Sequence, residues 1–295
     1  MFQGLAFGEM WTAIYVLVAL GLVAEQWAAA LRRKASSKRV RSSLLVALVS
    51  LVAACSYLHI HPWNLWSPGT RRLAGLLAKD ALPPRLPNNG WREILGAARA
   101  TFQMSFLAIL IAVLLGIPLA LGGARNFRVT RRSNAAVVRQ QLMRMFALVT
   151  RVIPPTVWAL LVLFVVLPGI FAGALALALY TIGVLARLFG DIAETADFQQ
   201  ADHAVRLGAL RPAAWLYGSL PDIAPKWTAY ALYRWEVAAR ESVVVGIVGA
   251  GGLGQLLSTQ TNGRFFHQMT GTLIAVIALT IVVDAVSASA RRSLR

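Results

Sequence analysis

Charged side chains interrupt an apolar stretch, residues 227–248, that is long enough to cross a membrane as a helix. An ionised side chain at the bilayer centre costs about 2.5–3.5 kcal/mol, so such charges are expected to face a protein interface or a wet path. Glu236 and Arg240 are four residues apart and can pair along one helical face. The stretch predicts a translocation path, with the candidate residues Arg234, Glu236, Arg240, Glu241 and Ser242.

Two interpretations of Arg240 stay open. In the first, Glu236 and Arg240 neutralise each other and hold neighbouring helices together. In the second, Arg240 helps an anion to pass, because a guanidinium group matches the oxygens of a phosphoryl or phosphonyl group in bidentate fashion. Glu241 opposes a purely anion-attracting path.

A glycine-rich run, residues 246–255, follows the charged stretch directly. It does not match a dinucleotide-binding loop, because no strand precedes it and it falls at membrane depth. Irregular backbone at this depth is tolerated where it is buried in protein or lines a cavity. The run predicts an external gate or a close subunit contact, with a flexible turn as the alternative; the candidate residues are Gly249, Gly251, Gly252 and Gly254.

A polar segment, residues 191–226, precedes the charged stretch. Gly208 can take a positive φ that closes a short helix, and Pro221 is expected to end the next one. The segment therefore predicts two short cytoplasmic helices, which either dock a partner or form a solvated loop. Small, apolar and charged side chains that a partner could contact are Ala204, Leu207, Leu216, Arg206 and Arg211.

Composition indicates an all-α integral membrane protein. The chain has 295 residues, of which 58% are hydrophobic and 14% are charged, whereas soluble domains have about 45–50% and 25%. The net charge of +17 is attributed to loops beside lipid headgroups rather than to a nucleic-acid surface. Seven stretches predict transmembrane helices, at residues 11–31, 44–61, 97–122, 140–167, 170–189, 227–248 and 269–287.

The distribution of basic residues predicts the orientation of these helices. Arginine and lysine cluster between the first two stretches and again at residues 125–139, so both loops are expected in the cytoplasm. This places the N-terminus outside and the C-terminus in the cytoplasm. Residues 1–93 are then expected to hold two helices and a structured external loop from residue 62, although that loop also carries basic residues, and residues 94–295 are expected to hold the other helices.

The sequence predicts neither an enzyme nor a metal protein. It contains no G-x-x-x-x-G-K-[ST] loop for ATP, and Cys55 is its single cysteine. With four histidines scattered along the chain, His203 is not expected to bind a metal. The first apolar run is too long for a cleavable signal peptide, so it is expected to be a retained span.

The polar segment resembles the cytoplasmic EAA signature of permease subunits in bacterial ABC importers. That signature reads Glu-Ala-Ala, three residues, Gly, nine residues, Ile, one residue, Leu-Pro, and its spacing fits from Asp202 to Pro221. Asp202, His203 and Gly218 depart from the pattern. The resemblance implies that the segment couples the chain to a separate ATPase, through Asp202, His203, Ala204, Arg206, Gly208, Leu220 and Pro221.

The glycine run, Val-Gly-Ala-Gly-Gly-Leu-Gly, resembles methionine and phosphonate importer permeases, and the preceding Tyr-Arg-Trp-Glu at residues 233–236 with Arg240 looks more like the phosphonate branch. The resemblance covers residues 97–287. It implies a type I permease core, residues 94–295, that pairs with a second permease subunit, expected to be identical. Two ATPase subunits that hold ATP and Mg, an external substrate-binding protein and a phosphonate, phosphite or phosphate cargo are also implied.

Three other functions remain as alternatives. One is a methionine-type ABC permease. Another is an ion-coupled secondary transporter, in which Glu236, Arg240, Glu241 and Asp284 would form a proton or ion relay, although the inverted repeats typical of that class are not evident. The third is a membrane scaffold without transport activity, for which the charged stretch has no evident use.

Overall fold

The computed structural model describes residues 90–124, 134–196 and 199–293, together with isolated positions between 49 and 87. The chain divides into two compact units, Met1–Pro84 and Arg85–Arg295, and nearly all described residues belong to the second. The predicted helices at 11–31 and 44–61 lie outside the described residues. The predicted division at residue 93 and the external loop from residue 62 also stay predictions.

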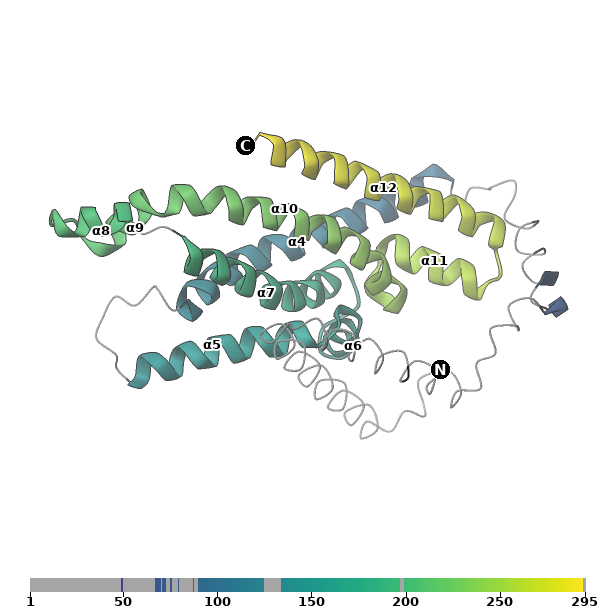
Figure 1. Ribbon diagram of the computed structural model, residues 1–295. Helices are drawn as coiled ribbons and strands as arrows, with labels where there is room; N and C mark the ends of the chain where they lie inside the picture. The colour runs from purple at the N-terminus through teal and green to yellow at the C-terminus, as the bar shows by residue number, and fades with distance from the viewer. Residues whose placement is uncertain are drawn as a thin grey trace. The chain divides into compact units, whose positions relative to one another are not determined.

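The described part of the second unit is a bundle of helices (Figure 1). Long helices alternate with short ones that redirect the chain. In order they are α4 (Trp91–Gly123), α5 (Asn134–Val152), α6 (Pro155–Val165), α7 (Ile170–Thr195), α8 (Gln199–Arg206), α9 (Arg211–Gly218), α10 (Leu220–Val245), the π-helical turn η2 (Gly246–Ala250), α11 (Gly252–Asn262) and α12 (Phe266–Arg292).

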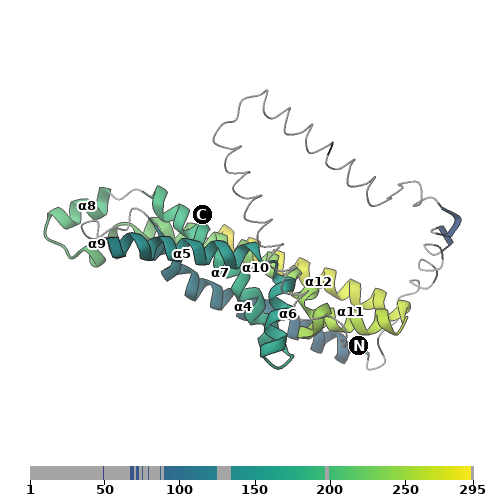
Figure 2. The same cartoon turned by 90° about the horizontal axis from the view of Figure 1, so that it is seen from below.

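Helices α4 and α7 form the centre of the bundle, with α5 and α10 packed beside them (Figures 1 and 2). Small residues on α7 allow this close packing: Ala172, Ala174, Ala176 and Ala178 are fully buried. A Cβ atom added at Gly173 would come within 2.6 Å of the Met104 sulfur, so α4 approaches α7 closely there. By contrast, α12 buries few of its side chains and lies at the edge of the bundle.

In the described part of the chain, three single helices are long and apolar enough to cross a membrane: α4, α7 and α12. They coincide with the predicted stretches 97–122, 170–189 and 269–287. Two bent helix pairs raise the number to as many as five among the described residues. The stretch 227–248 lies in α10 and η2, which form one of these pairs with α11 at a bend of 56°.

The expectation of one continuous helix over residues 140–167 is wrong. The chain forms α5 and α6, which meet at an angle of 96°. Pro154 and Pro155 cause the break, because proline lacks a backbone N–H and disfavours helical conformation in the residue before it. Pro155 then begins α6. A backbone N–H at this position would have no intrahelical acceptor, so proline breaks no hydrogen bond there.

Candidate coupling and translocation sites

The turn between α8 and α9 depends on Gly208, whose φ is +95°. The Ala209 N–H donates to the Ala204 carbonyl at 3.0 Å, and the Gly208 N–H donates to the Val205 carbonyl at 3.0 Å. These two bonds form a Schellman motif, which ends a helix through a residue in left-handed conformation. The positive φ predicted for Gly208 is confirmed, and it separates two short helices as expected.

Pro221 has a different place from the one predicted. Helix α9 ends at Gly218, and Pro221 lies in the first turn of α10. Proline fits there because the first N–H groups of a helix have no intrahelical acceptor. A Cβ atom at Gly218 would lie 2.9 Å from the Ala201 nitrogen, so this glycine lets α9 pack onto α8. The expectation that Pro221 ends the second short helix is therefore wrong.

The α8–α9 hairpin lies at the end of the bundle where α7 finishes and α10 begins (Figure 1). It exposes apolar side chains. Leu207, Leu210 and Tyr217 are 89%, 78% and 79% exposed. The signature residues Asp202, His203, Arg206 and Gly208 are exposed beside them, and Ala204 and Leu220 are half-buried. Clustered apolar groups rimmed by polar ones are typical of a protein contact surface.

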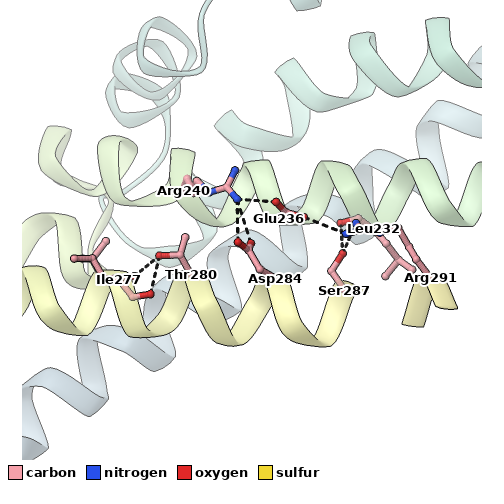
Figure 3. Close-up of polar contacts among 9 residues, drawn as sticks. Leu232, Glu236, Arg240, Ile277, Thr280, Asp284, Ser287 and Arg291 are labelled. Carbon is pink, nitrogen blue, oxygen red and sulfur yellow. Dashed lines mark hydrogen bonds and ion pairs between the residues drawn. The ribbon is translucent and has the colours of Figure 1, made fainter. Parts of the chain in front are cut away.

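One face of α10 carries a chain of charges toward α12 (Figure 3). Arg240 Nη2 donates to Glu236 Oε1 at 2.6 Å and to both carboxylate oxygens of Asp284 at 3.2 Å. Arg291 Nη2 lies 3.5 Å from Glu236 Oε2, and its Nη1 donates to Ser287 Oγ at 2.7 Å. The i,i+4 pairing predicted for Glu236 and Arg240 is confirmed and is extended to two charges on α12.

A second ion pair on α10 faces α7. Arg234 is 7% exposed, and its Nη2 donates to Glu241 Oε1 at 3.2 Å and Oε2 at 3.0 Å. Its guanidinium carbon lies 4.8 Å from the centre of the Tyr180 ring, within range of a cation–π interaction. Arg234 Nε is buried and has no hydrogen-bond partner among the described residues. Ser242 is buried and donates to the Ala239 carbonyl at 2.8 Å.

The predicted path residues therefore lie in two places. Arg234 and Glu241 face the centre of the bundle, while Glu236 and Arg240 face the peripheral helix α12. Within the single chain, the Arg240 side chain remains 48% exposed. Arg234 is the more enclosed guanidinium group, although sequence reasoning emphasised Arg240.

The glycine run breaks the helix, as predicted. Gly249, Gly251 and Gly252, in the turn between α10 and α11, have φ values of 118°, 103° and 72°. Positive φ values are readily adopted by glycine and rarely by other residues. A Cβ atom on Gly254 would lie 1.9 Å from the Val243 carbonyl oxygen. These glycines therefore let the start of α11 pack closely against the end of α10 at the bend.

Helix α11 is also fixed to α4. The Leu253 N–H donates to Thr101 Oγ1 at 2.9 Å, and a Cβ atom on Gly252 would lie 2.4 Å from the same oxygen. Sequence reasoning missed Thr101, Tyr180 and Arg291 as partners of the predicted residues, and it considered Asp284 only as part of an ion relay. One signal was available, since Asp284 is the single acidic residue within α12.

The sequence matches, over residues 112–295, the family described as the inner membrane component of binding-protein-dependent transport systems, and the chain belongs to this family. The phosphite transport system permease protein PtxC of Stutzerimonas stutzeri is 30% identical over 216 residues, which cover 73% of this chain and 76% of PtxC. HtxC of the same organism, provisionally named a phosphite transport permease, is 29% identical over 268 residues, or 90% of this chain and 91% of HtxC.

Another relative is the phosphate-import permease protein PhnE of Mycolicibacterium smegmatis, which is 30% identical over 77% of this chain and 41% of its own length. Among solved structures, a chain of the inward-facing methionine ABC transporter MetNI superposes with a TM-score of 0.61 at 18% identity, covering 71% of this chain and all of that one. An amino acid ABC transporter gives 0.57 at 20% identity, over 68% and 94% of the two chains.

The fold is that of an ABC importer permease, as predicted. The chain is a multi-pass component of the inner membrane and a transport subunit.

Proposed function

We propose that this chain is the permease of an ATP-driven importer that carries phosphite, phosphonate or phosphate inward across the membrane. The observation that carries the proposal is the agreement among relatives: two are named for phosphite transport and one for phosphate import. The two phosphite relatives match over 90% and 73% of this chain. The family match over residues 112–295 includes the charged helix and the glycine run.

The α8–α9 hairpin is the proposed contact with a separate ATPase subunit. Leu207 and Leu210 offer exposed apolar surface, and Asp202, His203 and Arg206 surround it with polar groups. Only Ser219 separates α9 from α10, so a displacement of the hairpin would reach the charged helix directly. ATP and Mg would bind to the ATPase subunits, and the chain itself would hold no cofactor.

The proposed assembly has two permease subunits, two ATPase subunits and an external substrate-binding protein. The family description, which names binding-protein-dependent transport, supports the last of these partners. We propose a homodimer of permeases. An external gate would form at Gly249, Gly251, Gly252 and Gly254. The backbone of the first three has a positive φ, and Gly254 lies in the first turn of α11.

Anion passage would involve a guanidinium group on α10. Arg234 is the better candidate for the central path, because it is buried against α7 and its Nε–H has no acceptor within the described part of the chain. Its pairing with Glu241 would keep anion binding weak, and weak binding is what conduction requires. Arg240, which is paired with two carboxylates, would mainly hold α10 against α12.

Uptake by intact cells tests the cargo. A strain that lacks this chain should lose uptake of labelled phosphite, methylphosphonate or phosphate, and expression of the chain should restore it. Restoration of methionine uptake instead would support the methionine-type alternative. The ion-coupled alternative finds less support, because the chain belongs to a binding-protein-dependent family.

Co-purification tests the ATPase contact. Leu207→Asp should abolish recovery of the ATPase subunit with the permease, because it places a charge in the centre of the proposed apolar contact. Leu167→Asp is a matched control, since Leu167 is 88% exposed in the connection between α6 and α7, beyond the opposite end of α7. Equal recovery with both variants would remove the hairpin from the contact.

A further inference from the structure

A cavity of about 440 Å³ lies between α4, α5 and α7. It is lined by the last turns of α4, the second half of α5 and the last turns of α7, near the end of the bundle from which α8 and α9 follow. Its volume lies within the range of about 300–1,000 Å³ that is usual for small-ligand sites. None of its lining residues belongs to α10, so it is separate from the two ion-pair sites described above.

The cavity is lined by more positive than negative groups. Three guanidinium groups and two carboxylates reach it, from Arg144, Arg151, Arg187, Asp191 and Glu194. Arg144 forms an ion pair with Glu194, and Arg187 Nε lies 3.6 Å from Asp191 Oδ2. With all five groups ionised, the described part of the lining therefore carries one net positive charge.

Arg144 also has a structural use. Its Nε donates to the Gly123 carbonyl at 2.8 Å, and Gln140 Nε2 donates to the same oxygen at 2.9 Å. Gly123 is the last residue of α4, where helix carbonyls lack partners and basic groups are favoured. This contact explains why Arg144 is present, but it does not involve Arg151 or Arg187.

Arginines in membrane-crossing helices are costly and generally mark a functional site. Arg151 is on α5 and Arg187 is on α7, so the cavity gathers guanidinium groups from two helices. Guanidinium groups bind phosphoryl and phosphonyl oxygens in bidentate geometry. Basic pockets between transmembrane helices also bind the phosphate groups of lipid headgroups.

We propose that this cavity binds a phosphoryl or phosphonyl oxyanion through Arg144, Arg151 and Arg187. The oxyanion is either free in solution or part of an anionic lipid headgroup. The two sources share the same chemistry at the guanidinium groups, and they differ in whether binding requires an acyl chain. The site does not depend on the identity of the transported solute, because binding can be measured without transport.

The test is a melting-temperature measurement on the full chain in nanodiscs of two compositions. In phosphatidylcholine alone, inorganic phosphate is added and compared with chloride at equal ionic strength. In a second set, phosphatidylglycerol replaces part of the phosphatidylcholine and no phosphate is added. A rise with inorganic phosphate indicates a free oxyanion, and a rise only with phosphatidylglycerol indicates a headgroup.

Arg151→Gln should lower the affinity for the stabilising ligand by about tenfold or more, since one charge-assisted contact is lost. Arg187→Gln provides a second variant in case the first one does not fold. Arg139→Gln removes the same charge from an exposed position of α5 that does not line the cavity, and it should leave the shift unchanged. The proposal would be overturned if neither ligand raised the melting temperature. It would also be overturned if Arg139→Gln reduced the rise as much as Arg151→Gln does.

Discussion

Arg240 on α10 donates to both carboxylate oxygens of Asp284 on α12, at 3.2 Å each, across 44 residues of sequence. Glu236 shares the same guanidinium group and also approaches Arg291, so two basic and two acidic groups alternate along the contact (Figure 3). Because α12 buries little of its surface elsewhere, this network fixes the position of a peripheral helix.

We expect Arg240→Gln to destabilise the chain more than Asp284→Asn. The first change leaves two carboxylates without their shared partner, whereas the second removes one contact and leaves Arg240 paired with Glu236. Hydrogen bonds between transmembrane helices average about 0.6 kcal/mol, which is the expected size for Asp284→Asn. Thermal unfolding in detergent measures the loss of stability in each variant. The double variant should lose less stability than the two single variants added together. Additive losses would mean that the two residues are not coupled.

Arg234→Gln should reduce stability strongly, since it leaves the Glu241 carboxylate largely buried without its partner. Breaking a buried ion pair costs about 3–5 kcal/mol. The paired variant, Arg234→Gln with Glu241→Gln, should recover most of the folded protein and still transport poorly if Arg234 guides the anion. Normal uptake by a folded paired variant would exclude Arg234 from the path.

Gly208→Ala should weaken ATPase recruitment. The site has open space for a methyl group but a φ of +95°, and left-handed conformation costs a non-glycine residue about 1–2 kcal/mol. The turn between α8 and α9 should therefore shift, and less ATPase should co-purify. Gly96→Ala, at a helical position of α4 with equally open space, is the control that should retain recruitment.

Gly254→Ala should prevent normal packing of α11. The added methyl group would occupy space held by the Val243 carbonyl oxygen, and backbone cannot rotate away as a side chain can. Overpacking of this kind costs about 1–3 kcal/mol or more. The yield of folded protein after detergent extraction measures the effect, and a wild-type yield would contradict the close α10–α11 contact.

The sequence predicted those parts of the structure that depend on local properties. Long apolar stretches located α4, α7 and α12, since spanning length and hydrophobicity are read along the chain. The positive φ of Gly208 and the break at the glycine run also follow from local backbone preferences. The turn at Pro221 was misassigned because proline is compatible with the start of a helix as well as with its end.

Features that depend on contacts between distant segments could not be predicted. The bend at Pro154 is an exception, because the proline pair is a local signal. It was missed because apolar residues continue across it, and hydrophobicity alone indicates one helix. The partner of Arg240 lies on α12, and no local pattern links the two helices. The same applies to the cavity, whose arginines come from different helices and become a group only in the folded bundle.

The central claim is ATP-driven import of a phosphorus oxyanion. It is tested most directly with the full chain in proteoliposomes, together with its ATPase and binding protein. Uptake of labelled phosphite or phosphonate should require ATP in the lumen and the binding protein outside, and it should stop when either is omitted. Uptake by the chain alone under an ion gradient, with no response to ATP, would contradict the account.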